Sequence, residues 1–173
     1  RKEKADEKKA KLDEIRLDIE SKKRKAQMLE DLEKNMEGFN FSVKKIVADA
    51  KSGLLSGVYG PVSRIISVEN EYSVAIEVAL GNAMQNIVVE SDADAKRAIS
   101  LLKKGNHGRA TFLPVSTIRA KNFDTEGAKE MYGYVGVASE LVSCDKKYKE
   151  IIKYLLGGTV VAEDIDSATS IAK

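Results

Sequence analysis

Asp92 and Asp94 are the residues whose spacing first suggests chemistry, because two neighbouring carboxylates can share general acid and base roles. Ser91 stands three positions before Asp94, which is the spacing of a capping box at the start of a helix. The helix dipole also stabilises negative charge at a helix N-terminus. We therefore interpret this pair as helix-capping residues and not as a catalytic dyad.

Single histidine and cysteine residues limit the other chemistry that the sequence could support. His107 and Cys144 are too few for a structural zinc site. His107 lies in a glycine-bounded loop, and Cys144 ends the apolar run Leu141–Cys144, where we expect a small buried hydrophobe. The phosphate-binding pattern Gly-x-x-x-x-Gly-Lys-Ser/Thr does not occur. The sequence thus predicts no catalytic residue, no cofactor and no metal ligand.

A basic cluster flanks the apolar segment that ends at Pro114. Besides His107, its members are Lys103, Lys104, Arg109, Arg119 and Lys121. Lys103 and Lys104 also fall at the end of a predicted helix, where they would complement the helix dipole without any partner. Two interpretations stay open, a solvated basic face and a surface that contacts nucleic-acid phosphates. The net charge of +2 does not separate them, because DNA binding would depend on a local patch.

The overall composition is typical of a soluble folded protein. A chain of 173 residues that is 43% hydrophobic and 32% charged can form one core and an appendage. No run approaches the roughly 18 consecutive apolar residues of a membrane helix. The charged N-terminus does not suit a signal peptide. We therefore expect no membrane association, and the single cysteine fits a reducing cytoplasm.

Residues 1–38 are predicted to form a coiled-coil arm that precedes a globular domain of residues 39–173. Residues 1–37 hold 12 Lys/Arg and 11 Asp/Glu but no glycine or proline. Their apolar or small residues follow alternating steps of three and four, with Lys8 and Lys22 at polar seam positions: Ala5, Leu12, Ile15, Ile19, Ala26 and Leu29. So narrow a seam needs a partner helix. A solvated single helix is the alternative.

The globular part contains an internal repeat. Gly57-Val58-Tyr59-Gly60 aligns with Gly133-Tyr134-Val135-Gly136, 76 residues later, and the same offset pairs Ser67, Tyr72 and Gly81 with Ser143, Tyr148 and Gly157. After a loss of four residues the alignment resumes at an offset of 72, which pairs Asp92 with Asp164 and Asp94 with Asp166. The repeat predicts two related half-domains, of about residues 54–120 and 121–173.

Each half-domain is predicted to alternate strands with helices, so the fold class is α+β (mixed α/β) behind a long helix. The predicted strands are Val62–Val68, Asn86–Val89, Arg109–Pro114, Val137–Cys144 and Thr159–Val161. The predicted helices lie around Val74–Ala79 and Ile151–Leu156 and over Asp92–Lys104. Four glycines are predicted to make structural turns, the second and fourth as left-handed helix caps: Gly60, Gly81, Gly136 and Gly157.

Several stretches in the same order resemble the hinge domain of SMC (structural maintenance of chromosomes) proteins of the bacterial chromosome-partition type. They are Tyr59–Val62, Tyr72–Asn82 and Gln85–Val89 in the first half, Gly108–Pro114 with Ile118 in the centre, and Gly136–Val161 with Ala168–Lys173 in the second half. The resemblance covers about residues 54–173, and the arm matches the family's coiled coil. Family members continue with a further strand and a glycine-rich segment, so the second half-domain is expected to be incomplete.

The resemblance implies a dimerisation and DNA-contacting module rather than an enzyme, with ATP hydrolysis left to the heads of the full-length protein. The implied partners are a second SMC hinge, usually in a homodimer, a coiled-coil helix of the same chain, and DNA bound weakly and without sequence preference. The implied location is cytoplasmic and nucleoid-associated. The DNA contact would use the basic cluster.

The implied dimer contact would use Phe112, Leu113, Val115 and Ile118. From the residues alone this segment could either close the core or present a strand edge. Dimerisation is expected to be weak or absent without the further strand and firm with it. The alternative function is a small-ligand or nucleotide-binding α/β domain on a helical stalk. The turn Ser67–Glu71 of this chain speaks against that alternative, because it is acidic and glycine-free and would repel phosphate.

Overall fold

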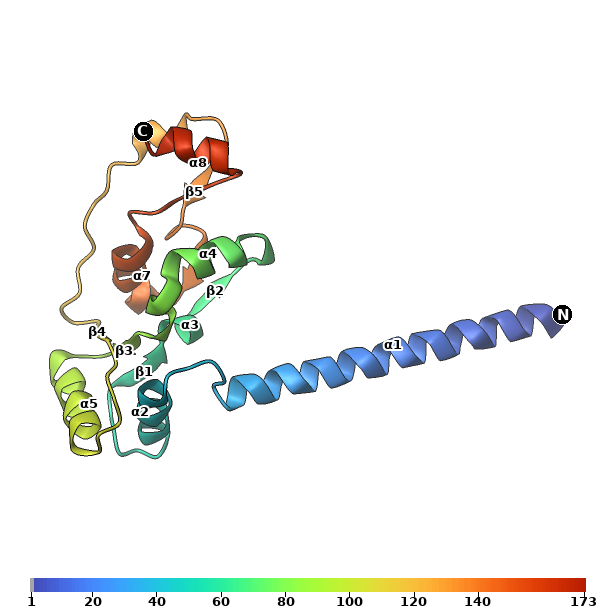
Figure 1. Ribbon diagram of the computed structural model, residues 1–173, viewed down its shortest axis with the longest axis horizontal. Coiled ribbons are helices and arrows are strands. Elements are labelled where there is room, and N and C mark those ends of the chain that lie inside the picture. Colours follow the sequence, from blue (N-terminus) through green and yellow to red (C-terminus); the bar gives the residue numbers. More distant parts are fainter. Residues whose placement is uncertain (1) are drawn as a thin grey trace. The chain divides into compact units, whose positions relative to one another are not determined.

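The computed structural model describes the backbone of residues 2–173 and the side chains from residue 7 onward. The chain divides into two compact units, of which the first ends at Phe39 and the second is Asn40–Lys173. Figure 1 shows one long helix in the first unit and several short helices and strands in the second. The first unit leaves most of its apolar side chains exposed, whereas the second has a hydrophobic core.

Helix α1 (Lys2–Lys34) confirms the predicted long N-terminal helix. It ends before residue 37, because Met36 and Gly38 have positive φ angles of 51° and 85° that a right-handed helix does not accommodate. Its larger apolar side chains are about half exposed: Leu12, Ile15, Leu17, Ile19, Met28 and Leu29. Four of them, Leu12, Ile15, Ile19 and Leu29, lie on the predicted seam, and such a narrow apolar stripe on a charged helix is typical of a coiled coil.

The first half of the second unit is built on a three-stranded sheet. Its strands are β1 (Val58–Pro61), β3 (Ile87–Val89) and β4 (Phe112–Pro114), in the order β1-β3-β4. β1 pairs with β3 antiparallel, and β4 pairs with β3 parallel through the crossover helix α5 (Asp92–Lys104). Helix α2 (Phe41–Lys51) packs against β1 and α5. All three side chains of β3 are fully buried.

The second half repeats part of this plan. Strand β5 (Tyr134–Val137) pairs antiparallel with β7 (Val160–Ala162), and helix α8 (Ile165–Ile171) packs against both. The short helix α6 (Glu126–Lys129) precedes β5. In the described residues β7 has no strand on its other edge, where β3 has β4. The side chains of β7 are accordingly only half-buried.

A two-stranded antiparallel sheet joins the halves. Strand β2 (Ile66–Val68) pairs with β6 (Val142–Cys144), and Ser67 lies opposite Ser143, its equivalent in the repeat. The halves are therefore related by an approximate two-fold axis at this pair. Helices α4 (Ser73–Leu80) and α7 (Lys149–Leu156) also pack together, preceded by the 3-10 turns η1 (Asn70–Tyr72) and η3 (Lys146–Tyr148).

The core draws on both halves. Its buried members are Val62, Ile76, Leu80, Val88, Leu113, Ala138, Tyr148, Ile151, Ile152 and Leu156. An aromatic contact adds to it, since the rings of Tyr59 and Tyr148 meet edge to face at 5.4 Å. The Lys147 ammonium lies 4.2 Å from the centre of the Tyr59 ring, and its hydrogen bond to Tyr148 raises the Lys147 pKa. The two halves thus share one core.

The internal repeat is confirmed, but the predicted offset of 72 residues in its second part is wrong, because the structure gives 73. Both sheets shift register at the same place, between Val58 and Gly60 and between Tyr134 and Gly136. Beyond the shortened loop, the backbone caps of α5 and α8 are Ser91 and Asp164, 73 residues apart. The deletion therefore removes three residues, and Asp164 is equivalent to Ser91 rather than to Asp92.

Several predicted strands are shorter than expected. The stretch Val62–Val68 is not one strand, because residues 62–65 form the helical turn α3 (Val62–Ile65) before β2. Val137–Cys144 likewise splits into the end of β5, a turn and β6. Only Phe112–Pro114 of the predicted Arg109–Pro114 is a strand. Apolar runs alone could not show these turns, because turn residues 62 and 138 are buried like the strand residues. The helices α4, α5 and α7 agree with prediction.

The predicted glycine turns are correct only in part. Gly81 ends α4 with a positive φ of 48°, and Gly60 has a φ of 122° at the register shift of β1. Gly157 is not left-handed, since its φ is −67°. A Cβ there would lie 2.4 Å from the Lys153 carbonyl oxygen. Gly136 lies within β5, where a Cβ would approach Leu141 to 3.2 Å. Close packing therefore explains these last two glycines.

Candidate dimer and nucleic-acid interface

The central segment begins with β4, an edge strand. Its backbone pairs with β3 on one side, in the register Ile87–Phe112, Val88–Leu113 and Val89–Pro114. The pairing continues past the strand, because the Val115 amide donates to the Val89 carbonyl at 2.9 Å. In the described residues no strand pairs with its other side. β4 therefore offers a free backbone edge, as an interface strand requires.

A turn follows β4 and fixes the remaining apolar residues. The amides of Thr117 and Ile118 donate to the Pro114 carbonyl at 3.3 and 3.1 Å. The Thr117 hydroxyl donates to Asp92 Oδ1 at 3.1 Å, which joins the turn to the start of α5. Val115 and Ile118 are half-buried and pack against the core. The turn thus holds Ile118 against the body of the domain.

The four predicted interface residues differ in exposure. Leu113 is a core residue that is only 4% exposed. A partner could therefore reach Leu113 only through its backbone. Phe112, Val115 and Ile118 are half-buried and keep accessible surface. These three are the side chains of the segment that a partner could contact.

All five predicted DNA-contacting cations are exposed, but they lie at two ends of one strand. Lys103 and Lys104 occupy the last turn of α5, and Arg109 follows in the loop that leads to β4. Arg119 and Lys121 come after β4, at its opposite end. A three-residue strand spans about 10 Å. The structure therefore groups three cations before β4 and two after it.

Local contacts restrict Arg119 after β4 and the backbone around Arg109 before it. The Arg119 guanidinium donates to the carbonyl oxygens of Ile118 and Ser116 at 2.7 and 3.0 Å, so part of its hydrogen-bonding capacity is used by its own turn. In the loop, the His107 ring packs on Phe41 with ring centres 5.6 Å apart. The Arg109 carbonyl accepts a hydrogen bond from the Ser42 hydroxyl at 2.6 Å. The backbone around Arg109 is therefore fixed to α2, while its side chain is exposed.

Of the two aspartates considered for catalysis, Asp94 caps helix α5, whereas the Asp92 carboxylate accepts a hydrogen bond from the Thr117 hydroxyl. Ser91 and Asp94 form a complete capping box at the start of α5: the Ser91 amide donates to Asp94 Oδ2 at 3.0 Å, and the Asp94 amide donates to the Ser91 hydroxyl at 3.4 Å. Asp94 is buried and also pairs with Arg97. Among the described residues, no group of histidine, cysteine and acidic side chains could hold a metal ion.

Comparison with known proteins identifies the domain. The family model "SMC proteins Flexible Hinge Domain" matches residues 55–172. This chain belongs to the SMC hinge family. The match includes β4, both halves of the repeat and the basic residues named above.

Relatives of the hinge chain are chromosome partition proteins. It is 38% identical to the Smc protein of Bacillus subtilis (strain 168) over 158 residues, which are 90% of this chain and 13% of that protein. It is 36% identical to the Smc protein of Methanocaldococcus jannaschii in an alignment 175 positions long, gaps included, which covers 99% of this chain and 14% of that protein. The chain thus spans about one-seventh of the length of these relatives.

Solved SMC hinges have the same fold. An asymmetric dimer of the Geobacillus stearothermophilus SMC hinge domain matches with a TM-score of 0.90 and 38% identity, over 95% of this chain and 66% of that chain. The Pyrococcus furiosus hinge with an extended coiled coil matches with a TM-score of 0.60 and 31% identity, over 90% of this chain and 60% of that one. The predicted α+β fold behind a long helix is therefore confirmed. Within the described residues, no helix is long and apolar enough to cross a membrane.

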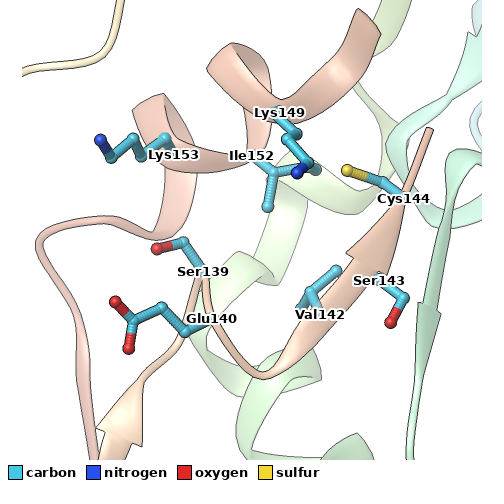
Figure 2. A pocket seen from close by; sticks show the side chains of 8 residues that line it. All are labelled: Ser139, Glu140, Val142, Ser143, Cys144, Lys149, Ile152 and Lys153. Atoms are coloured by element: carbon cyan, nitrogen blue, oxygen red, sulfur yellow. The ribbon is translucent and has the colours of Figure 1, made fainter. Parts of the chain in front are cut away.

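The hinge chain also has a cavity that sequence reasoning missed. It has a volume of about 530 Å³ and lies between α7 and β6 (Figure 2). Lys149, Ile152 and Lys153 of α7 line it, and Val142 and Cys144 of β6 lie opposite. Burial raises the pKa of the Cys144 thiol, and the nearby Lys149 opposes this shift. A sequence signal did exist: the repeat aligns Lys149 with Ser73 and Lys153 with Glu77.

Proposed function

We propose that this chain is the dimerisation module of an SMC chromosome partition protein, and that it pairs with a second SMC hinge, in a homodimer. The observation that carries the proposal is the match to a hinge dimer over 95% of the chain. The free edge of β4, with the accessible side chains of Phe112, Val115 and Ile118 beside it, supports this segment as one side of the contact. Strand pairing across an interface satisfies both backbones, and the side chains add specificity.

In the described residues, β4 in the first half and β7 in the second each have a strand on one side only, both at the sheet edge away from β1 or β5. A two-fold dimer in which β4 of one copy met the second half of the other would use both edges twice. The same pair of surfaces would then form twice in one dimer. This geometry explains how short strands could support a stable dimer.

Sedimentation velocity tests the dimer. We expect weak or absent dimerisation of this chain and firm dimerisation of a chain extended at its C-terminus, at tens of micromolar, where a micromolar interface is saturated. Phe112→Arg and Ile118→Lys should make the extended chain monomeric. Val78→Arg is the matched control, because Val78 is 76% exposed on helix α4 and lies outside both the β4 segment and the second half. A monomeric extended chain, or a dimer that survives both substitutions, would contradict the assignment.

We further propose that the hinge contacts DNA weakly and without sequence preference through Lys103, Lys104, Arg109, Arg119 and Lys121. The exposure of all five supports this role. Each neutralised phosphate releases counterions, so affinity should fall steeply with salt. Replacing the three cations before β4 with glutamine should lower affinity about tenfold and flatten the salt dependence. Replacing Lys129, Lys146 and Lys173 removes the same charge elsewhere and should have little effect. Equal losses in both variants would assign the effect to net charge alone.

In this proposal the chain itself has no catalytic role, and ATP hydrolysis belongs to the heads of the full-length protein. The first unit would pair with a coiled-coil helix of the same chain, and the protein would act in the cytoplasm on the nucleoid. The hinge comparisons support this function over a nucleotide-binding domain on a stalk. The acidic, glycine-free segment Ser67–Glu71 also opposes the latter.

A further inference from the structure

The cavity between α7 and β6 carries unbalanced positive charge. Lys149 and Lys153 are four residues apart on one face of α7, and both line the cavity. Figure 2 shows Lys149 on the Cys144 side and Lys153 on the Ser139 side. The ion pairs found among the described residues include neither lysine. Among the residues that line the cavity, Glu140 is acidic and Lys149 and Lys153 are basic, while Asp145 acts on the nearby Cys144 without lining the cavity.

The repeat shows that the fold does not need these lysines. The equivalent positions of α4 in the first half are Ser73 and Glu77, and α4 forms the same two-turn helix. Two like charges at this spacing destabilise a helix slightly. The two lysines therefore add positive charge that the fold of a half-domain does not require.

The backbone of the cavity is also particular to the second half. Residues 62–65 form the helical turn α3 in the first half, whereas the equivalent residues 138–141 form a turn of another kind. This turn supplies Ser139 and Glu140 to the rim. Both the shape and the charge of the cavity thus arise where the second half departs from the first.

The lining determines what could bind. A volume of about 530 Å³ is within the usual range for small-molecule sites. Two ammonium groups and the Ser139 hydroxyl are hydrogen-bond donors, and lysine binds phosphate as a point charge. Ile152 and Val142 give an apolar wall on which a non-polar portion could rest.

We propose that this cavity is a binding site for a small phosphate-bearing ligand, held by Lys149 and Lys153 with Ser139 at the rim. The residues that line the cavity include none of the β4 segment or of the basic cluster, and the site does not depend on the proposed dimer or DNA contact. It binds a compact phosphate group in the cavity rather than the backbone of a nucleic-acid strand.

Cys144 gives a direct readout, because it lines the cavity and is the only cysteine of the sequence. Its rate of alkylation by iodoacetamide, a neutral reagent, would be measured with and without pyrophosphate at constant pH. A bound phosphate would block access and neutralise Lys149, which otherwise favours the thiolate. If the dissociation constant is about 1 mM, 10 mM pyrophosphate should slow alkylation about tenfold. Potassium chloride at the same ionic strength should leave the rate unchanged.

Variants distinguish the binding of pyrophosphate by the two lysines from a general effect of ionic strength. The double variant Lys149→Gln/Lys153→Gln should lose the protection by pyrophosphate, each protein being compared with its own rate without ligand. Lys146→Gln is the matched control, because Lys146 lies just before α7 and does not line the cavity. The control should keep the full protection. Thermal unfolding gives a second readout: pyrophosphate should raise the Tm of the parent protein and of the control but not of the double variant.

Three results would overturn the proposal. Protection by chloride equal to that by pyrophosphate would show general screening. Full protection of the double variant would show that the lysines do not hold the ligand. Protection by a thymidine oligonucleotide without protection by pyrophosphate would assign the surface to nucleic acid and not to a small ligand.

Discussion

The two halves of the hinge share one plan but protect their central strands differently. Strand β3 lies between β1 and β4 under the long helix α5, and its three side chains are fully buried. Its equivalent β7 has one neighbouring strand and the shorter helix α8, and its side chains are half-buried. The same short strand is therefore a core element in one half and an edge element in the other. The number of neighbouring strands, more than the local sequence, therefore determines how deeply each side chain is buried and how much it contributes to stability.

The shared core gives the largest expected effect. Leu80 of α4 and Leu156 of α7 are equivalent in the repeat, and both are buried in the one cluster. Leu80→Ala and Leu156→Ala should each lower the free energy of unfolding by about 3 kcal/mol through lost burial and a new cavity. Urea denaturation followed by circular dichroism would measure both. A single cooperative transition is expected in each variant, and separate transitions of the halves would contradict a common core.

The central strands should respond unequally. Val88 of β3 and Val161 of β7 are equivalent, but Val88 is 0% exposed and Val161 is half-buried. Val88→Ala should cost about 2 kcal/mol of stability, and Val161→Ala about 1 kcal/mol or less. The same denaturation experiment compares them. Equal losses would mean that β7 is as well covered as β3 in solution, for example by a partner chain.

The helix caps give the smallest effect and differ in their response to pH. Asp164 caps α8, with its carboxylate accepting from the Ser167 amide at 2.7 Å. Hydrogen bonds from the Ser167 backbone and side chain lower the Asp164 pKa. A lowered folded-state pKa means that the contribution is fully present above the unfolded pKa of about 3.9 and is lost as pH falls through the folded value. Ser91, the equivalent cap of α5, has no charge to lose.

Asp164→Asn tests this difference, because asparagine also caps helices but does not titrate there. The stability of the parent protein relative to the variant should be constant near pH 6 and should decrease below about pH 4. Urea midpoints across this range would show it. Thr169→Ser is the control, because the Thr169 hydroxyl of the same helix donates to the Ile165 carbonyl, and it should show no such change. A pH-independent difference for Asp164→Asn would mean that its charge has no role in the cap.

Sequence reasoning succeeded where a pattern was local. The capping box at Ser91 and Asp94 marked the start of α5, and helical periodicity found α4 and α7. It failed where strands are only three residues long, because such strands are too short to show a period and Val62 is buried in a helical turn. The one-residue error in the repeat arose for a similar reason, since several aspartates follow one another and only the hydrogen-bonded cap identifies Asp164 as the partner of Ser91.

The candidate interface was predicted only in part. Its residues could be named from the sequence, but the burial of Leu113 and the separation of the cations on either side of β4 depend on how β4 packs against β3. The cavity depends on tertiary structure as well, because α7 and β6 surround it. The sequence does mark its two lysines, as the positions where the repeat replaces Ser73 and Glu77 by cations.

The pairing of Ser67 with Ser143 also bears on the origin of the domain. An antiparallel pair in which the central residue meets its own counterpart, while Ile66 pairs with Cys144 and Val68 with Val142, is the contact that two identical chains make across a two-fold axis. A gene duplication that fused two copies of a self-associating ancestor would leave such a ladder inside one polypeptide. The ladder would then be the oldest protein–protein interface of the hinge, and the divergence of the copies would have freed the outer strand edges for later partners.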